Sequence, residues 1–540
     1  MRVYNHTTDE LSHIAGAVGL YETGRNVYMV EHPTLQRLVV GAALKGAGVE
    51  YPPARLLTQI PPRNQANAAG AEIVFHGKVP YWTVLAVARR ANLVFAAVLF
   101  LYTYLLGRYL AGDLAAMLAV VFLSFDANVL AHSALVTTDI PAAAGFLAAT
   151  YHALRFVARP RWRTAVYAGV ALGLAMSCKF TCVLLAPAIV ILIGVRALRH
   201  RRRRFWAAVP NWRYWIAIPC VAFLTLWATY LFNVGRLRDQ QLFEDQKTWV
   251  RIPAWVKATP IPMPSMALGM MFMGAIGKTG FPCYFNGRLD FNGHLGYFPE
   301  ALALKSPTGL VVAFVLAVIA CGVSVRRSRK SIIPLCLILP PIFLLLTAMT
   351  GKLQIGIRHI LPVIPFVYLF AVIYLRRGWW LGLLIAMIVV SGLETARAHP
   401  DYLPFFNWIA GGPRNGSKYL ADSNLDWGQD AARLADYLHA TKRTDYTIRL
   451  SGARVPDLAA FLGLDADSLW RDYEALRQHP HGLFAISINA RLGLEDFKKE
   501  SDGTLVHGPD FSWLKNYPLV KRIGYSIEVY DINPESVIAK

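Results

Sequence analysis

The sequence predicts a mainly α-helical, polytopic membrane protein with a soluble α/β domain at its C-terminus. Hydrophobic residues make up 55% of the 540 positions and charged residues only 16%, whereas soluble proteins carry about 25% charged residues. Apolar runs that approach the ~20 residues needed to cross a bilayer recur between residues 91 and 394. This composition excludes fibrous, disordered and disulfide-stapled classes of protein.

Residues 1–90 are expected to form a first loop outside the cytoplasm that contains amphipathic helices. They precede the first apolar run and show no signal peptide. We therefore expect the whole protein to have a further transmembrane helix upstream of Met1. Arg89 and Arg90 are expected at the outer end of the first apolar run, where they would face lipid headgroups.

About ten transmembrane helices are predicted in residues 91–394. The predicted spans are Ala91–Gly107, Leu114–Phe125, Asp139–Phe156, Ala165–Ser177, Phe180–Val195, Tyr214–Phe232, Thr308–Val323, Ile332–Met349, Ile360–Leu375 and Trp379–Leu393. Four short basic loops indicate the cytoplasmic side, and these are Arg159–Arg163, Arg199–Arg204, Arg326–Lys330 and Arg376–Arg377. This orientation leaves the first loop, a large loop at 233–307 and everything after Glu394 outside.

The net charge of +21 has a topological explanation. Thr395–Lys540 holds 17 basic and 19 acidic residues, so all the basic excess lies in the apolar part of the chain. Nucleic-acid binding requires a basic face on a folded domain, and no such domain is predicted. We therefore expect membrane lipids, and not nucleic acid, to be partners of this chain.

Residues 395–540 are predicted to form a small α/β domain. Apolar residues recur with helical spacing in Gln429–Ala440, and Asp426 followed by Gln429 resembles a capping box at the start of that helix. β-Branched and aromatic residues predict strands at Tyr446–Leu450, Leu483–Ile488 and Ser526–Ile532.

Ionisable side chains gather at the predicted outer rim of the membrane region and not at mid-helix depth. Such residues are costly near a bilayer unless they have a role. They are Asp9, Glu10, His13, Glu31, His32, Asp126, His132, Asp139, Lys179, Asp290, His294, Lys305, Lys352, Arg358 and His359. Their arrangement predicts a polar site open to the outer leaflet.

Each of these residues also has a structural interpretation that the sequence leaves open. Asp139 suits a helix N-cap, while Lys179 and Arg358 suit headgroup anchors. His32 precedes Pro33 and suits a turn, and the adjacent Asp9 and Glu10 suit a solvated surface.

A nucleotide cofactor or donor is not expected. Phe272–Thr279 misses the P-loop pattern because Phe272 occupies the place of its first glycine, and no GxGxxG follows a predicted strand.

Several long motifs resemble lipid-carrier-dependent glycosyltransferases of the GT-C superfamily. These enzymes are grouped with protein O-mannosyltransferases and the aminoarabinose transferase of lipid A. The motifs are DELSHIAGAVGLYETG at Asp9–Gly24, EHPTL at Glu31–Leu35, DANVLAHSALVTTD at Asp126–Asp139, MSCKFT at Met176–Thr181, YFNGRLDFNGHLGYFPEALALKSP at Tyr284–Pro307, IGIRHILPVIPF at Ile355–Phe366 and DSNLDWGQD at Asp422–Asp430. The tail motif IGYSIEVYDI at Ile523–Ile532 fits bacterial members. The resemblance implies a multi-pass protein of a bacterial inner (cell) membrane.

The resemblance also implies roles for individual residues. Asp9 matches the family's catalytic Asp, with Glu10 beside it, and Asp139 matches a second acidic residue that helps to hold a metal or the donor phosphate. His32, Lys179 and Arg358 match positions suited to the lipid phosphate, although Thr34 departs from the usual second proline. The candidate substrate-binding residues are His13, Asp126, His132 and His294, and the candidate ligands of a divalent metal are Asp9 and Asp139.

The expected reaction is inverting sugar transfer on the outer face of the membrane. The donor would be a polyprenyl-phosphate sugar, and the acceptor a hydroxyl of protein Ser/Thr or of a glycolipid. Asp9 would act as the general base, and Arg358, Lys179 or a metal would stabilise the departing phosphate. The alternatives are a polytopic carrier or lipid flippase, which would place polar groups at the bilayer midplane, and a catalytically inactive envelope scaffold.

Overall fold

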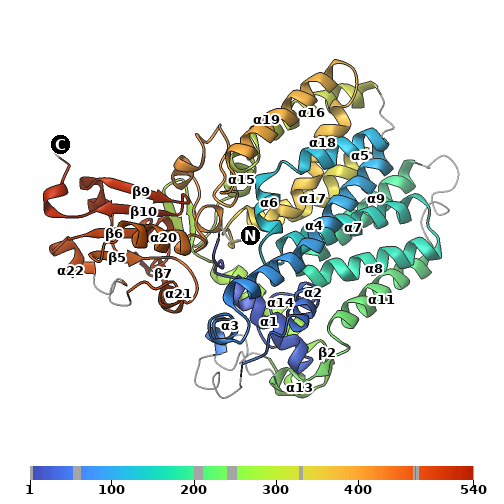
Figure 1. The fold of residues 1–540 in the computed structure, drawn as a ribbon. Coiled ribbons are helices and arrows are strands. Elements are labelled where there is room, and N and C mark those ends of the chain that lie inside the picture. The colour runs from blue at the N-terminus through green and yellow to red at the C-terminus, as the bar shows by residue number, and fades with distance from the viewer. Residues whose placement is uncertain are drawn as a thin grey trace.

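The computed structural model consists of a helical bundle and a smaller domain that contains most of the strands (Figure 1). The structure describes residues 4–52, 62–199, 211–239, 252–327, 333–465, 469, 473–500 and 502–538. The predicted basic stretches at residues 200–204 and 328–330 lie outside these ranges. The predicted mainly α-helical architecture with a C-terminal α/β domain is confirmed.

The first loop forms α1 (Glu10–Thr23), α2 (Leu35–Gly46), α3 (Pro62–Ala71) and the short π-helical segment η2 (Glu72–His76). Every residue of α1 from Glu10 to Leu20 is buried, so this helix is not amphipathic as predicted. It contacts both α2 and α3. Its small residues permit this packing: a Cβ built at Gly16 would lie 2.9 Å from Nε of Arg37 on α2.

A helix lies in each predicted span, although α5 ends before Phe125 and α11 ends before Phe232. The helices are α4 (Tyr81–Ala111), α5 (Asp113–Leu123), α7 (Asp139–Ala158), α8 (Trp162–Cys178), η3 (Phe180–Leu184) with α9 (Leu185–Arg199), α11 (Trp212–Thr229), α16 (Thr308–Arg327), α17 (Ile333–Thr350), η5 (Ile357–Val363) with α18 (Ile364–Leu375), and α19 (Trp379–Arg397). In the described part of the chain, four helices are long and apolar enough to cross a membrane, or up to six if each bent pair is one span. The number of ten crossings stays a prediction.

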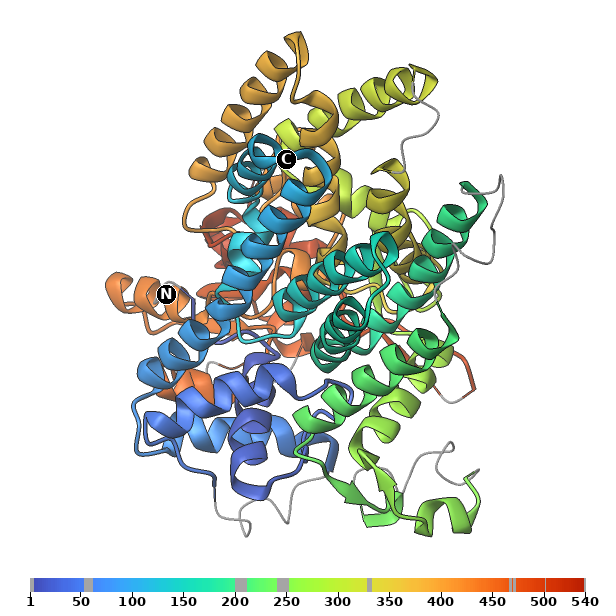
Figure 2. The ribbon, with the colours of Figure 1, turned by 90° about the vertical axis from the view of Figure 1, so that its right-hand side faces the viewer.

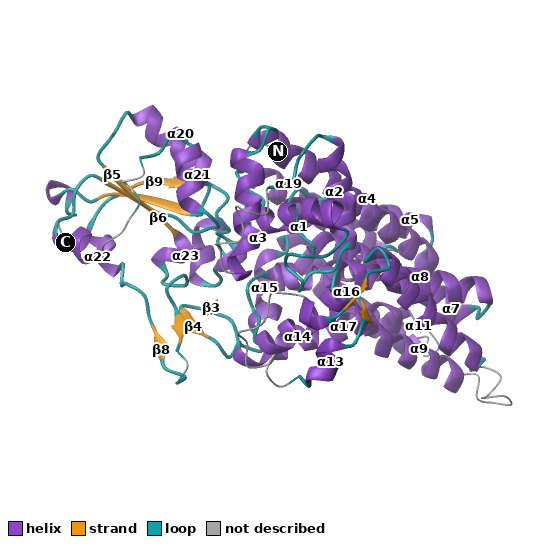
Figure 3. Cartoon of the chain, turned by 90° about the horizontal axis from the view of Figure 1, so that it is seen from below, coloured by secondary structure: helices purple, strands orange, loops and turns teal. Residues whose placement is uncertain are grey.

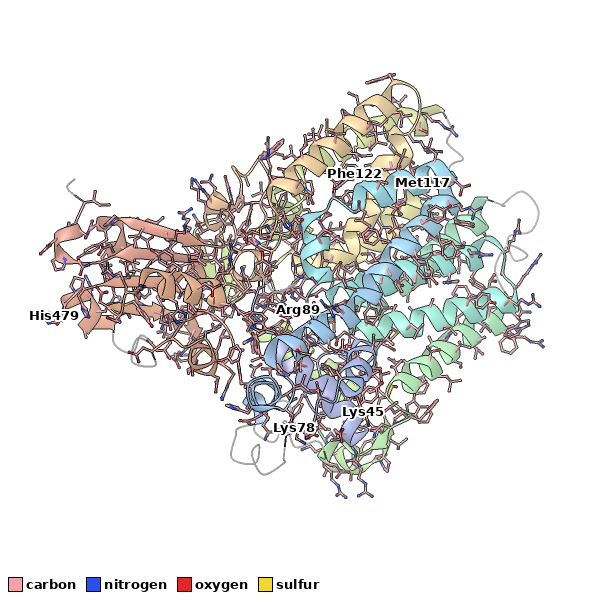
Figure 4. All side chains as sticks on the ribbon, viewed as in Figure 1. Lys45, Lys78, Arg89, Met117, Phe122 and His479 are labelled. Atoms are coloured by element: carbon pink, nitrogen blue, oxygen red, sulfur yellow. The ribbon has the colours of Figure 1, made fainter. Side chains whose placement is uncertain are left out.

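The outside of the bundle is apolar, as expected of an integral multi-pass membrane protein. On α5, Phe122 is fully buried while Met117 is 60% exposed, and Figure 4 labels both side chains. Exposed Leu101 and Val315 are two further examples, on α4 and α16. Large apolar surfaces are unfavourable in water, whereas lipid chains solvate them well.

Small residues let the bundle helices approach closely. A Cβ built at Gly145 of α7 would lie 2.8 Å from Cα of Ala175 on α8, and one built at Gly107 of α4 would lie 3.0 Å from Cα of Ala116 on α5. Close backbone approach of this kind is typical of packed membrane helices.

The large outer loop contributes short strands and helices outside the predicted spans. These are β1 (Val234–Gly235), β2 (Ile261–Pro262), α13 (Ala254–Ala258), α14 (Pro264–Thr279), β3 (Cys283–Phe285), β4 (Arg288–Asp290) and α15 (Tyr297–Lys305). Figure 2 shows the N-terminal helices in blue beside the green part of this loop. The near-miss to a P-loop, Phe272–Thr279, lies within helix α14.

The C-terminal domain contains a four-stranded sheet of order β5-β6-β10-β9 (Figure 3). The strands are β5 (Tyr446–Arg449), β6 (Leu483–Ser487), β9 (Leu519–Ile523) and β10 (Ile527–Asp531), and β5 pairs with β6 in parallel while the other pairs are antiparallel. Three of these strands were predicted, as was α20 (Ala431–Thr441), which buries Leu434 and Leu438.

The predicted capping box is wrong. Helix α20 begins at Ala431, after Gln429. Asp426 instead accepts hydrogen bonds from the backbone N–H groups of Gly428 at 3.2 Å and Asn489 at 3.1 Å. Gln429 accepts a hydrogen bond from the backbone N–H of Trp427. These residues therefore organise the turn before α20 and not the helix end itself.

Candidate active site

Asp9 and Arg358, which are 349 positions apart in the sequence, form an ion pair. Nη1 of Arg358 donates to Oδ2 of Asp9 at 2.6 Å, with side-chain exposures of 11% and 24%. Asp9 directly precedes α1, and Arg358 lies in η5. Because this ion pair is partly exposed, an anionic ligand can reach Arg358 and replace Asp9 as its partner.

Asp139 and Lys179 form a second ion pair. Nζ of Lys179 donates to Oδ1 of Asp139 at 2.8 Å. Asp139 begins α7, and Lys179 follows the last residue of α8. Because the Lys179 side chain is only 15% exposed and bound to Asp139, it does not serve as the headgroup anchor that the sequence left open.

His13 and His32 lie together, with ring centroids 4.9 Å apart. Nδ1 of His32 is 3.2 Å from Oγ1 of Thr138, the residue before Asp139. Burial lowers the pKa of His32 well below its ordinary value, as do the neighbouring positive charges. Both imidazoles therefore belong to the same polar region as the second ion pair, and His32 is neutral near pH 7.

The two ion pairs act on the same imidazole. Burial lowers the pKa of His13 to about 4, and the charges of Arg37 and Arg358 lower it too, whereas Asp9 and Asp139 raise it. Because electrostatic interactions fall off with distance, the residues of both pairs that act on His13 lie in one region. The predicted convergence of acidic and basic side chains from distant parts of the chain is therefore present.

Several buried polar atoms in this region have no hydrogen-bond partner among the described residues. They are Nδ1 of His13, Nδ1 of His132, Oδ2 of Asp139 and Nε of Arg358. Buried polar groups are nearly always paired in folded proteins, because an unpaired group pays the full cost of desolvation. Four unpaired atoms around the two ion pairs indicate a site that is built to receive a polar ligand.

Trp427 brings the C-terminal domain into this site. Its ring lies under the guanidinium of Arg358, with Cζ 4.2 Å from the ring centroid. The ring of His132 is 5.9 Å away, and the backbone carbonyl of Trp427 accepts hydrogen bonds from N and Oγ1 of Thr8 at 3.0 and 3.2 Å. The DSNLDWGQD motif is therefore part of the candidate active site.

Asp422 adds a third carboxylate near Arg358. It has a positive φ of 57°, and its backbone N–H donates to Oδ1 of Asn489 at 2.8 Å. Burial raises the pKa of Asp422 to about 6, Arg358 lowers it, and Asp9 raises it. A non-glycine residue in a left-handed conformation is often found where a side chain has to be aimed at a site.

Glu10 is a structural residue and not part of the catalytic group. It is fully buried, and it receives hydrogen bonds from Arg89 Nη2 at 2.7 Å and Arg89 Nε at 2.9 Å. Backbone N–H groups of Thr7 and Val136 also donate to it. Arg89, labelled in Figure 4, therefore points inward to Glu10 and does not face lipid headgroups. Arg90, its neighbour, is exposed.

Asp126 is likewise structural. It is fully buried at the N-terminus of α6 (Ala127–Ser133), where it accepts hydrogen bonds from the backbone N–H groups of Asn128 and Val129 and from the hydroxyl of Tyr368 at 2.9 Å. Its oxygens are engaged in capping α6 and fixing α18. A substrate-binding role for Asp126 is therefore not supported.

His294 lies in the large outer loop, where it contacts residues that belong to neither ion pair. Its Nε2 is 3.9 Å from Oδ2 of Asp290, and its ring packs on Phe285 at 5.0 Å. Its backbone N–H donates to Oε1 of Gln354 at 2.7 Å. The contacts of His294 thus connect the β3–β4 hairpin to the 350–356 segment and not to either ion pair.

The residues present do not fit a metal centre. Among the described residues, no group of three or more His, Cys, Asp or Glu side chains is arranged to hold a metal ion. Asp9 and Asp139, the expected ligands, each face a cationic side chain instead. We therefore derive no catalytic step through a metal.

Comparison with protein families identifies one segment of the chain. Residues 83–228 match the family described as dolichyl-phosphate-mannose-protein mannosyltransferase, which belongs to the GT-C superfamily. The resemblance to GT-C enzymes is confirmed over these residues. The matched segment extends from α4 to α11 and includes Asp139 and Lys179. It supports the expected class of activity, glycosyl transfer.

Comparison with curated proteins gives no match. Among solved structures, ArnT from Cupriavidus metallidurans is similar to this chain at 12% identity, over 100% of this chain and 96% of that one. The TM-score is 0.45 for ArnT bound to undecaprenyl phosphate and 0.48 for its apo state.

The sequence alone did not predict the contacts of Thr8, Trp427 and Asp422 at this site. Nothing local to Thr8 distinguishes it from an ordinary loop residue. The other two lie in the DSNLDWGQD motif, which the sequence singled out without assigning a role to its side chains. An aromatic residue within such a polar motif was the available signal, because Trp at a polar site commonly receives a cation.

Proposed function

We propose that this protein is an inverting membrane glycosyltransferase. It moves a sugar from a polyprenyl-phosphate donor to a hydroxyl acceptor, either a protein Ser/Thr or a glycolipid, on the outer face of a bacterial inner membrane. The observation that carries the proposal is the convergence of two carboxylate–cation pairs with unpartnered buried polar atoms. The match of residues 83–228 to a mannosyltransferase family supports the same class of reaction.

The two cations suit the phosphate of the donor. Arg358 retains an unpaired Nε donor, and Lys179 is partly exposed. In the transition state the C–O bond between the sugar and the phosphate breaks, and the phosphate gains negative charge. Positive groups that are already in place stabilise that charge without reorganisation.

Asp9 suits the role of general base. In the structure, Arg358 donates a hydrogen bond to the carboxylate of Asp9. The donor phosphate competes with Asp9 for Arg358, so donor binding frees this carboxylate. The freed carboxylate takes the proton of the acceptor hydroxyl as that oxygen bonds to the anomeric carbon. Polyprenyl phosphate leaves with the electron pair, and this single displacement inverts the anomeric configuration.

The test is a comparison of envelope glycans and glycoproteins by mass spectrometry in cells with and without the gene. We expect one sugar-sized mass difference to vanish with the gene, to return with the wild-type gene, and not to return with Asp9→Asn. Glu22→Gln removes an exposed carboxylate from α1, the helix that Asp9 directly precedes, and is the matched control, which should restore the sugar. Restoration by Asp9→Asn would remove Asp9 from the mechanism.

A further inference from the structure

The guanidinium of Arg358 is held on two sides. Its Nη1 donates to Asp9 at 2.6 Å, and its Cζ lies 4.2 Å from the centroid of the Trp427 ring. Its Nε has no partner in the described part of the chain, although the residue is 91% buried. A planar cation confined by a carboxylate edge and an aromatic face keeps its free donors pointing in one direction.

Trp427 itself is held firmly. It is 4% exposed, and its backbone N–H donates to Oε1 of Gln429 at 2.7 Å. Gln429 in turn donates through Nε2 to the carbonyl of Leu425 at 3.1 Å. The turn that carries the ring is thus closed on itself by side-chain hydrogen bonds.

The same turn is tied to the segment before Asp9. Thr8 donates twice to the carbonyl of Trp427. Nδ2 of Asn5 donates to the carbonyl of Gly428 at 2.7 Å, and Oδ1 of Asn5 accepts from the backbone N–H of Ala432 at 3.1 Å. Residues 5–9 and 427–432 therefore form one unit, in which Asp9 and Trp427 have a fixed relation.

We propose that Trp427 is a positioning residue for the donor phosphate, acting through Arg358. This inference rests on the proposed function. The indole face holds the guanidinium in place after the phosphate has displaced Asp9, so that Arg358 remains aimed at the phosphate and does not follow the carboxylate. Trp427 itself makes no contact with the reacting atoms, and the C-terminal domain thereby supplies an essential part of the site.

The experiment measures binding of undecaprenyl phosphate to the full chain in lipid nanodiscs, with undecaprenol as the uncharged probe. A desolvated cation–π contact accounts for roughly a 10- to 30-fold change in affinity. We expect Trp427→Leu to weaken undecaprenyl phosphate binding by about that factor and Trp427→Phe to recover most of it. Binding of undecaprenol should not change in either variant.

The matched control is Trp408→Leu. Trp408 also lies under a guanidinium, that of Arg397 at 5.4 Å, but it is 46% exposed and the structure assigns it no contact with either ion pair in the described residues. Its loss should leave binding of undecaprenyl phosphate unchanged.

A double-mutant cycle separates positioning from simple structural support. If Trp427 acts through Arg358, Trp427→Leu has no further effect on phosphate binding in an Arg358→Gln background. An equal loss in both backgrounds would overturn the proposal, as would a failure of Trp427→Phe to recover binding. Fluorinated tryptophan at position 427 keeps the ring shape while weakening its negative face. It therefore tests the contact even if the leucine variant does not fold. If the affinity for undecaprenyl phosphate does not fall with fluorination, the proposal is overturned.

Failure of the proposed function gives a different result. If wild-type protein binds undecaprenyl phosphate no better than undecaprenol, the donor class is wrong. If wild-type protein prefers the phosphate and Trp427→Leu shares that preference at full affinity, the function stands and only the role of Trp427 is refuted.

Discussion

Arg89 and Glu10 meet at 2.7 Å with side-chain exposures of 3% and 0%. This pair connects helix α4 to the start of α1, one residue from Asp9. Because the pair is buried, water cannot solvate either charge when its partner is removed.

Arg89→Met should therefore destabilise the protein strongly. Removing one partner of a buried ion pair costs about 3–5 kcal/mol, because an uncompensated charge stays behind. The exposed pair of Lys78 with Glu50, at exposures of 79% and 64%, provides the control, since Lys78→Met should change the thermal unfolding midpoint very little. Equal midpoints for the two variants in the same detergent would contradict the structural role of Arg89.

Asp9→Asn should separate donor binding from transfer. The variant loses the proposed general base, so sugar transfer should fall by about 100-fold or more. Because Asn no longer holds Arg358 by charge, undecaprenyl phosphate should bind at least as tightly as to the wild type. Equilibrium binding and a single-turnover transfer assay check the two effects. Weaker phosphate binding in the variant would show that Asp9 does not compete with the phosphate for Arg358.

His132→Phe should reduce donor binding without loss of stability. The buried Nδ1 of His132 has no partner among the residues that the structure describes, so in the ligand-free protein it contributes a desolvation cost and no hydrogen bond. Phe retains the ring contact with Trp427 and removes that cost. We expect an unchanged or higher unfolding midpoint together with weaker binding of undecaprenyl phosphate. A fall in the midpoint with unaltered binding would assign His132 to the core of the fold.

The C-terminal domain should lose stability as the pH rises. Burial raises the pKa of Asp430 from 3.8 to about 7, against the lowering effects of Ser526 and Arg433. A carboxyl group with a raised pKa binds more protons in the folded state, so its stabilising contribution is present at low pH and is lost as the pH rises through about 4 to 7.

Asp430→Asn tests this pH dependence. The amide imitates the protonated carboxyl group, so the fall in unfolding midpoint between about pH 5 and about pH 8 should shrink. Asp502→Asn, at an exposed position, should retain the wild-type fall. A wild-type midpoint that rises over this range would refute the raised pKa of Asp430.

The sequence predicted those parts of the fold that depend on local pattern. Apolar runs placed a helix at each predicted span, and β-branched residues located β5, β6 and β10. Strand β9 was missed because four of its five residues are exposed and charged residues interrupt it. The burial of α1 was missed because it packs against α2 and α3, which no local sequence window contains.

Part of the candidate site was predictable from the sequence, because ionisable residues near a membrane are costly unless they have a role. That argument selected Asp9, Asp139, Lys179 and Arg358 together with eleven other side chains. The family resemblance then assigned roles to these four, and the structure pairs them. The same argument failed for Glu10, because a buried ion pair explains an unexpected charge equally well. The structure was needed to show that Glu10 pairs with Arg89 and that Asp9 pairs with Arg358.

The hydrogen bonds between Thr8 and Trp427 join residues 419 positions apart. The ribosome synthesises Thr8 long before Trp427, so these hydrogen bonds form only after translation has passed Trp427. A truncated polypeptide that ends before Trp427 lacks both hydrogen bonds at Thr8, the residue that precedes Asp9.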